Sequence, residues 1–355
     1  MATATFRQPL ASVTVNGTTV SNAVQDFDTH NNNYFTADTF RLRLALNALP
    51  SQLGAAFWAD TQAQIGISVD VGSGPQQLIL GNADTIDIDL PNGMVELGGR
   101  DLTASLIDTK TAAKYQNQTS SQIAAQIAAS AGLQANITAT STPAGRYYEI
   151  DHARLTSDVS QWTLLNYLAQ EEGFDVYVSG NTLNFVPSQQ NTAAAYTLTY
   201  QQPTAQQIRT GNFIKLGLRR SQTLARDVVV KVVSWNVKQA TAFTATAKRS
   251  GTSGSATADT AQIYTYKVPG LTQDQAQRFA NARLQEISLH ERVVDAVIPG
   301  ETGLTPRQLV SLSGTGTSFD QSYYIDSIDR SYSMDESFIQ TIKMKNHSPE
   351  STVSV

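Results

Sequence analysis

The feature that most constrains the fold is an alternation of apolar and polar side chains that recurs through the first 110 residues. It is clearest over 40–46, 65–71 and 86–90, where apolar residues occupy every second position. Alternation with this period indicates strands that bury one face. Asn16-Gly17 lies between two short alternating runs and is typical of a two-residue hairpin turn. Several short strands separated by turns predict an antiparallel β-barrel over residues 1–109.

After residue 110 the spacing of apolar residues changes from that of strands to that of helices. Thr119 and Gln122 have the spacing of a capping box, and a second helix is predicted from Asp158 to Gly173. An alternating hairpin follows that glycine. Residues 110–187 therefore predict a small α+β domain at the periphery.

Strand patterns return in residues 188–355 and predict a second β-barrel block. Within it, the Gly/Ser-rich segment 250–257 has few side chains to bury, so a flexible loop is expected there. Residues 272–290 carry apolar side chains at helical spacing and predict an amphipathic helix. We expect Phe279 and Leu284 to be buried where this helix packs on a barrel.

Composition supports a mainly β chain with α+β insertions and excludes several classes of protein. Charged residues make up 15% of the chain, below the usual share of about 25%. The net charge of −5 disfavours a general polyanion-binding surface, and the absence of cysteine removes disulfides and thiol chemistry. The sequence has neither a signal-peptide pattern nor a long apolar run, so membrane insertion is not expected.

No sequence motif predicts a metal, a cofactor or catalysis. The four histidines are scattered without ligand spacing. The segment from Asp26 to His30 begins like a calcium loop, but Asn31 and Ala37 stand where that loop needs glycine and glutamate. It is more simply a polar loop after a strand. We therefore expect neither metal nor cofactor and no enzymatic activity.

Two groups of residues would suggest other functions, a cell-wall hydrolase and a glycan-binding module. The adjacent pair Glu171-Glu172 would suggest a cell-wall hydrolase, but consecutive helical residues point about 100° apart. The aromatic residues Tyr147-Tyr148, Trp58 and Trp235 would suit an all-β module that binds host-surface glycan. Such aromatics more often belong to a core or an interface.

Four stretches of the chain resemble the baseplate hub proteins of contractile-tailed bacteriophages. These include Mu-like tail proteins and the late control protein D family, which is related to the N-terminal part of VgrG spikes. The stretches are GRDLTASLID at 99–108, YQNQTSSQI at 115–123, WTLLNYLAQEEGFDV at 162–176, and YYIDSI through KMKN at 323–346. Their order and spacing extend the resemblance over about residues 5–347.

The resemblance implies a structural protein of the virion tail baseplate, assembled in the bacterial host cytoplasm. Each chain would carry two related, tail-tube-like barrels. A homotrimer would then match the six-fold tail tube on one side and the three-fold spike on the other. Its expected partners are the tube protein, the spike protein and other baseplate proteins, and genomic DNA would pass through without specific binding. Because the sequence ends at Val355, we expect any spike or lytic activity on another chain.

A channel for DNA should not be lined by positive charge, because basic walls would retain the polyanion. Asp87 and Asp89 alternate with the apolar residues of 86–90 and so share one solvent-facing side of their strand. We expect this side, or the matching face of the second block near Asp326, to line the lumen. The alternative is an ordinary solvated face on an outer strand.

Overall fold

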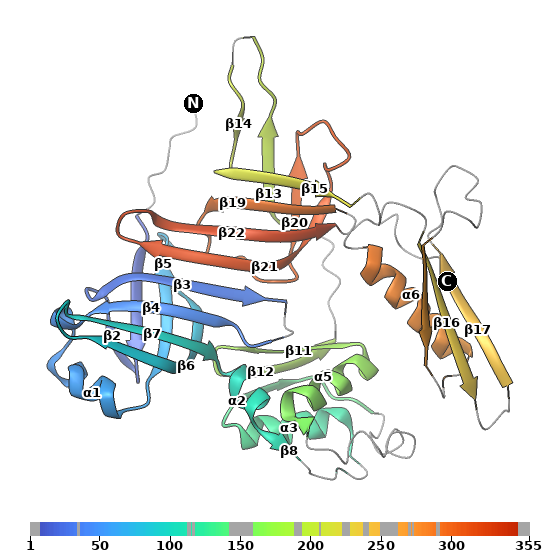
Figure 1. The fold of residues 1–355 in the computed structure, drawn as a ribbon, viewed down its shortest axis with the longest axis horizontal. Coiled ribbons are helices and arrows are strands. Elements are labelled where there is room, and N and C mark those ends of the chain that lie inside the picture. Colours follow the sequence, from blue (N-terminus) through green and yellow to red (C-terminus); the bar gives the residue numbers. More distant parts are fainter. Residues whose placement is uncertain are drawn as a thin grey trace. The chain divides into compact units, whose positions relative to one another are not determined.

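The chain forms two compact units, each assembled from segments distant in sequence (Figure 1). The first comprises Met1–Gln190, Pro299–Pro306 and Ser327–Thr341, and the rest of the chain forms the second. The division into three domains, with boundaries after residues 109 and 187, stays a prediction. The computed structural model describes residues 8–33, 36–111, 115, 118–141, 159–187, 194–205, 207–221, 228–236, 241–248, 262–268, 271, 273–288 and 292–346. The expected loop at 250–257 lies outside these residues.

The first unit is dominated by an antiparallel sheet with the strand order β3-β4-β7-β6-β5-β1-β2. These strands are β1 (Leu10–Val15), β2 (Thr18–Val20), β3 (Val24–Asn32), β4 (Thr39–Ala45), β5 (Gln64–Asp70), β6 (Pro75–Asp89) and β7 (Met94–Asp101). The other edge of β3 pairs with residues 327–333 of β21 (Ser322–Ser333). Asn16 and Gly17 both adopt positive φ between β1 and β2, which confirms the predicted hairpin.

The alternating residues of this sheet form one apolar core. Leu42, Leu44, Ile65 and Ile67 are fully buried, as their period predicts. Aromatic rings from the C-terminal part of the chain complete the core, where Phe27 stacks on Tyr332 at 5.4 Å between ring centroids and also contacts Phe338. The core therefore depends on contacts between residues about 300 positions apart.

The end of β6 departs from the sequence prediction. Ile86 and Ile88 are only half-buried, and Leu90 is 65% exposed. Leu90 lies beyond the last residue of β6, in the turn that leads to β7, so it is outside the pleat that would direct it inward. The alternation thus predicted the strand correctly, but it predicted more burial of its apolar side chains than the structure has.

Most residues of the strand series β14-β13-β20-β21-β22-β19-β15 belong to the second unit, while Ser327–Ser333 of β21 and Ser337–Thr341 of β22 belong to the first. These strands are β13 (Ala194–Gln201), β14 (Thr210–Gly211), β15 (Lys215–Arg220), β19 (Arg292–Pro299), β20 (Leu309–Ser313) and β22 (Ser337–Asn346), together with β21. The prediction of a mainly β chain is confirmed. Two closed antiparallel barrels are not, because the described sheets do not close on themselves and β13 runs parallel to β20.

An α+β part of the first unit follows β7. It contains α2 (Thr103–Asp108), β8 (Lys110–Thr111), α3 (Ser120–Ser130), β9 (Gln134–Ile137), β10 (Val159–Ser160), α5 (Gln161–Glu172), β11 (Phe174–Ser179) and β12 (Thr182–Pro187). The capping box of Thr119 and Gln122 is confirmed at the start of α3. The second helix begins later than predicted, because the hydroxyl of Ser160 accepts the hydrogen bond of the Thr163 N–H and caps it. Gly173 ends it in the left-handed conformation, as expected.

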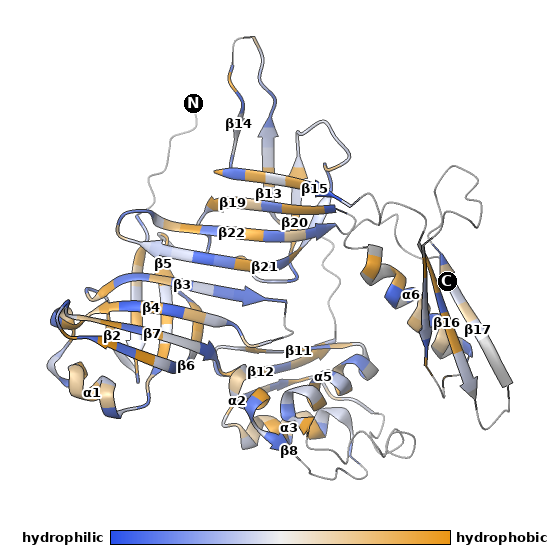
Figure 2. Cartoon of the chain, in the orientation of Figure 1, coloured by the Kyte–Doolittle hydropathy of each residue, from blue (hydrophilic) through white to orange (hydrophobic). Residues whose placement is uncertain are grey.

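A separate three-stranded sheet in the second unit carries the third predicted helix. The sheet has the order β17-β16-β18, formed by β16 (Val228–Asn236), β17 (Thr241–Lys248) and β18 (Gln262–Lys267). Helix α6 (Gln273–Ser288) packs on it (Figure 2). Leu284 is buried and Phe279 is half-buried in this contact. The helix therefore covers a small open sheet, and the predicted packing on a barrel is wrong. Among the described residues, no helix has the length and apolar character needed to cross a membrane.

Candidate functional site: a mixed-charge sheet face and a buried polar cluster

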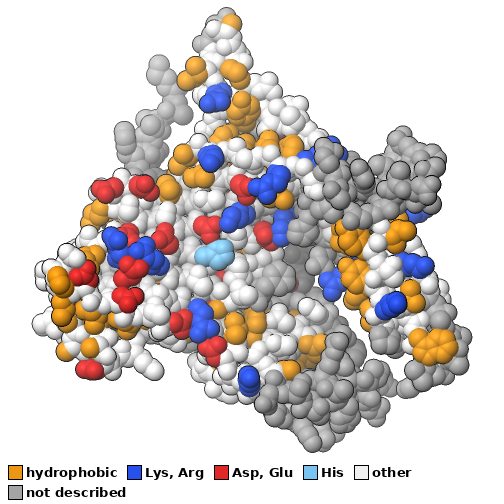
Figure 3. Space-filling view, viewed as in Figure 1, with side chains coloured by type: hydrophobic (Ala, Val, Ile, Leu, Met, Phe, Trp, Pro, Cys, Tyr) orange, Lys and Arg blue, Asp and Glu red, His pale blue; other side chains and the backbone are white. Residues whose placement is uncertain are grey.

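The exposed side of the first sheet presents charged side chains in rows that cross the strands. Strand register places Asp26 of β3 beside Arg43 of β4, Arg43 beside Glu96 of β7, and Glu96 beside Asp87 of β6. We call the six residues Asp26, Asp28, Arg41, Arg43, Asp87 and Glu96 the mixed-charge face. Figure 3 shows acidic and basic side chains side by side over this part of the sheet.

Most charges of the mixed-charge face are paired within the chain. Arg41 binds Glu96 through two hydrogen bonds, Nε to Oε1 at 2.6 Å and Nη2 to Oε2 at 3.0 Å. Its Nη1 also lies 3.6 Å from Asp28, and Arg43 lies 2.8 Å from Asp26. The hydrogen bonds from Arg41 lower the pKa of Glu96, whereas partial burial raises the pKa of Asp26 in spite of Arg43. The face is thus acidic only by a small excess.

Arg100 forms a second ion-pair group beside this face. Its guanidinium donates to Asp84 of β6 from Nε at 2.8 Å and to Asp108 of α2 from Nη2 at 2.8 Å. These hydrogen bonds raise the pKa of Arg100 and lower the pKa of Asp108. The contact fastens the first helix of the α+β part to the sheet from which it leaves.

The three carboxylates predicted to line a channel have different surroundings. Asp87 and Asp89 are both exposed on the solvent side of β6. Asp89 accepts hydrogen bonds from the Asn92 side chain at 2.6 Å and its N–H at 3.1 Å, which lower its pKa. Asp326, in the second unit, accepts a 2.7 Å hydrogen bond from Lys345 and is half-buried. Their assignment to a lumen stays a prediction.

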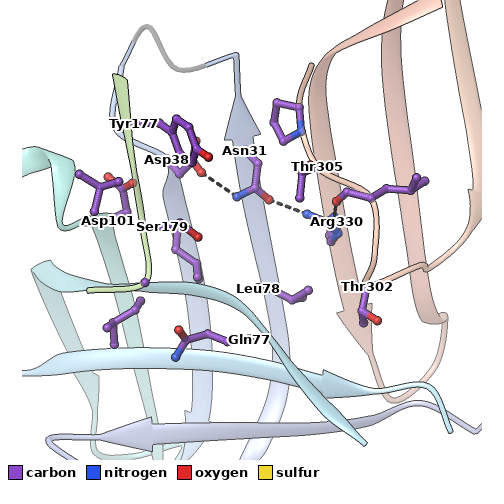
Figure 4. A pocket seen from close by; sticks show the side chains of 16 residues that line it. Asn31, Asp38, Gln77, Leu78, Asp101, Tyr177, Ser179, Thr302, Thr305 and Arg330 are labelled. Carbon is purple, nitrogen blue, oxygen red and sulfur yellow. Dashed lines mark hydrogen bonds between the residues drawn. The ribbon is translucent and has the colours of Figure 1, made fainter. Parts of the chain in front are cut away.

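A buried polar cluster lies on the opposite, covered side of the first sheet. Arg330 of β21 is only 4% exposed and donates from Nη1 to Asn31 Oδ1 at 2.6 Å and from Nη2 to the Leu304 carbonyl (Figure 4). Asn31 in turn donates to Asp38 Oδ2 at 2.7 Å. Burial lowers the pKa of Arg330 to about 10 and raises the pKa of Asp38.

Asp101, the last residue of β7, joins this cluster from the side of the α+β part. Its carboxylate accepts hydrogen bonds from the Thr103 N–H at 3.1 Å and the Thr103 hydroxyl at 2.9 Å. Its own N–H donates to the Asp38 carbonyl at 2.9 Å. Burial and, secondarily, the charge of Asp38 raise the pKa of Asp101 to about 7. Protonation of this group is therefore coupled to the packing of three chain segments.

The cluster borders a cavity of about 290 Å³ in the first unit. The end of β11 with the adjoining Gly180 (residues 177–180) and the segment 302–306 complete its wall (Figure 4). The carboxylates of Asp38 and Asp101 already accept hydrogen bonds from other groups of the chain. The arrangement can therefore hold the first sheet, residues 177–180 and the segment 302–306 together. The described groups of the cluster do not pair a nucleophile with a base.

The residues of this cluster are too far apart in the sequence for a local pattern to predict it. Arg330 and Asn31 are 299 positions apart, so no local pattern connects them. One signal was available. Arg330 occupies a position in the alternating strand 322–333 where neighbours of the same phase, such as Ile328, are buried. A cationic residue at a strand position where the alternation predicts burial indicates a buried hydrogen-bond acceptor or carboxylate beside it.

Three other candidate sites have ordinary structural roles. The Asp26–His30 segment lies within β3 itself, and the expected polar loop after a strand is wrong. Trp58 is 2% exposed and donates from Nε1 to the Leu53 carbonyl at 2.9 Å, so it belongs to the core. Glu172 accepts a 2.8 Å hydrogen bond from Ser120 and joins the end of α5 to the start of α3. Tyr147-Tyr148 lie outside the described residues.

Comparison with known proteins decides the family. The family model of the phage tail baseplate hub (GPD) matches residues 101–335, which is more than half of the chain. This chain belongs to the phage tail baseplate hub family. The resemblance seen in the sequence is thereby confirmed, and the hub is a structural protein of the virion tail. No curated protein matched the hub sequence.

Solved structures show the same fold at low sequence identity. A tail protein from Neisseria meningitidis MC58 is 14% identical with a TM-score of 0.68, and the match covers 97% of the hub and 98% of that chain. The 43 kDa tail protein of prophage MuSo2 from Shewanella oneidensis is 14% identical with a TM-score of 0.65, covering 98% and 100%. An E. coli type VI secretion component is 12% identical with a TM-score of 0.54, covering 95% of the hub and 77% of that chain.

Proposed function

We propose that this hub assembles as a homotrimeric ring between the six-fold tail tube and the three-fold spike. The observation that carries the proposal is the baseplate-hub family match over residues 101–335. The similarity to two tail proteins, one of them from a prophage, over nearly their whole length is consistent with it. Assembly would take place in the bacterial host cytoplasm, before the particle is complete.

The symmetry of such a joint follows from the content of one chain. Each chain has one large sheet region in each of its two units. Three chains arranged around a three-fold axis would therefore present six sheet regions to a six-fold tube, and three identical positions to a spike. This solves a symmetry mismatch with a single gene product.

Within that ring we propose that Asp87 and Asp89, or the face near Asp326, contribute to the wall of the DNA channel. Exposed carboxylates repel the phosphate backbone and prevent the counterion release that makes basic walls retain DNA. Asp87 and Asp89 are the better candidates, because the charge of Asp326 is offset by Lys345. The hub would transmit DNA without binding it and would have no enzymatic activity of its own.

Multi-angle light scattering of the purified hub tests the assembly. We expect a particle of three times the 38.3 kDa chain mass, and class averages with a three-fold symmetric ring. The measurement is repeated with the tube and spike proteins of the same phage, since these partners can close the ring. A hub that stays monomeric at high concentration and also with both partners would contradict the proposal.

The described aromatic residues that would support glycan binding do not form a binding site. Of these aromatics, Trp58 is buried in the core and Trp235 is exposed on a sheet with no neighbouring exposed aromatic among the described residues. Glycan-array binding by the hub would revive that alternative.

A further inference from the structure

In the β17-β16-β18 sheet, the two faces differ in what the described part of the chain packs on them. Helix α6 covers one face, where Val230, Val232, Ala245 and Ala247 are buried against the apolar stripe of the helix. Side chains alternate along each strand, so the intervening residues point to the other face. No described element packs on that second face.

The open face carries positive charge from all three strands. Lys231 lies in the middle strand between Thr246 and Thr265, Lys248 lies opposite Val229, and Lys267 lies opposite Val233. The three lysines are exposed. None of the three strands contains an Asp or a Glu, so no carboxylate within the sheet offsets this charge.

Apolar groups lie among these lysines. Trp235 is 50% exposed and Ile263 is 59% exposed, which are high values for large apolar side chains. Val229 and Val233 are half-buried between them. We call Trp235, Ile263 and the three lysines the lysine face. Exposed aliphatic and aromatic groups within a patch of one charge are typical of surfaces that a partner covers.

The charge of this region has the opposite sign to the rest of the chain. Residues 228–288 contain seven Lys or Arg and three Asp or Glu, whereas the whole chain contains 25 and 30. A local reversal of sign favours partners of complementary charge and determines which surfaces approach productively.

We propose that the lysine face is a docking surface for an acidic protein partner. A protein fits better than a nucleic acid, because a single exposed aromatic cannot provide the row of stacking platforms on which successive bases bind. The aliphatic share of the face suits a protein interface, and carboxylates of the partner would pair with the three lysines.

The size of the face is that of a weak or transient interface. Three strands spaced about 4.8 Å apart, each with about six residues at 3.3 Å, span roughly 300 Å². This is well below the ~800 Å² that each partner contributes to a standard interface. One face therefore binds weakly, and several copies in one assembly would bind the same partner with much greater avidity.

Tryptophan fluorescence gives a direct test. Among the three tryptophans, Trp58 and Trp162 are buried, so quenching by acrylamide reports mainly on Trp235. The full-length hub is titrated with poly-L-glutamate at low ionic strength. We expect acrylamide quenching to fall as the face is covered, and added salt to reverse the effect. The Trp235→Phe variant should lose the signal.

Matched charge reversals locate the binding site. Lys231→Glu combined with Lys248→Glu should weaken poly-L-glutamate binding by about tenfold. Lys110→Glu combined with Lys215→Glu changes the net charge equally at exposed lysines elsewhere and should leave binding nearly unchanged. Circular dichroism confirms that both variants are folded.

Three outcomes would overturn the proposal. Equal weakening in the two double variants would mean that net charge alone drives binding. Tighter binding of oligothymidylate than of poly-L-glutamate would assign the face to nucleic acid. A Trp235 that acrylamide cannot reach in the free hub would mean that the hub covers this face itself. None of these results depends on whether the hub forms a trimer.

Discussion

The mixed-charge face of the first unit and the lysine face of the second use the same structural device with opposite results. On the mixed-charge face, strand register places Arg43 next to both Asp26 and Glu96, so the cations are neutralised where they lie. On the lysine face, register brings together Lys231, Lys248 and Lys267 without a carboxylate on any strand of the sheet. In the first arrangement the charges of the sheet surface are neutralised within the chain. In the second they are left to pair with an acidic partner.

The largest effect is expected where the lysine face depends on its helix. Leu284 of α6 is 1% exposed among apolar residues of the sheet, so Leu284→Asp would bury an unpaired charge. We expect a loss of about 4 kcal/mol in the free energy of unfolding of this region. Urea titration followed by Trp235 fluorescence measures it.

Arg278→Asp serves as the control, because Arg278 is exposed on the same helix and its replacement should change stability little. Equal midpoints for the Leu284→Asp variant and the unmodified hub would mean that the helix is not packed as described.

A slightly smaller effect is expected beneath the mixed-charge face. Arg330→Ala removes the cation that bridges Asn31 and the Leu304 carbonyl and leaves Asp38 buried without its positive neighbour. Breaking one side of a buried charged group costs about 3 kcal/mol. Urea unfolding followed by the fluorescence of buried Trp58 reports on this unit.

The matched control is Arg219→Ala, since the Arg219 side chain is 77% exposed. It should change stability by less than about 0.5 kcal/mol. If both arginine variants behave alike, the buried cluster is not what holds the segment 302–306 in place.

Acidity should distinguish the two regions further, because the raised carboxylate pKa values belong to the first unit. The folded hub holds the Asp101 proton up to a pKa of about 7, far above the ordinary aspartate pKa of 3.8. The folded state therefore binds more protons between these values, and stability is lost as pH rises from about 4 through 7. Between pH 5 and pH 8, Asp101 should account for about 2 kcal/mol of this loss.

Asp101→Asn tests that assignment, because an amide oxygen can still accept the Thr103 N–H bond. The variant should be more stable than the unmodified hub at pH 8 and should lose most of the pH dependence. Parallel pH curves for the two proteins would show that Asp101 ionises normally in the folded state.

The smallest effect on folding is expected from changing the two exposed carboxylates at the end of β6. Substituting both Asp87 and Asp89 with Lys should leave the melting temperature nearly unchanged, since both side chains are exposed. The assembled ring should retain DNA at low salt, and genome delivery should slow. The substitution Asp60→Lys with Asp335→Lys makes the same charge change elsewhere, and DNA retention that is equal in both proteins would remove Asp87 and Asp89 from the lumen.

Features formed by residues close in the sequence were predictable, and features that bring together distant segments were not. The Asn16-Gly17 hairpin and the Thr119–Gln122 capping box depend on neighbours within a few positions, so the sequence pattern was sufficient. The lysine face is formed by residues of three strands whose pairing no local pattern specifies. The same limit explains why alternation predicted strands correctly but not whether the sheets would close.

The pairing of β3 with residues 327–333 has a consequence for how the hub is made. At about 5–20 residues per second, a ribosome needs roughly 15–60 s to reach that partner strand after completing β3. During this interval the nascent first unit exposes an unpaired strand edge, a template for aggregation with neighbouring chains. The acidic and amide side chains of β3, including Asp26, Asp28 and Asn32, oppose such pairing. The strand that receives the last segment of the unit thus also protects the growing chain until that segment arrives.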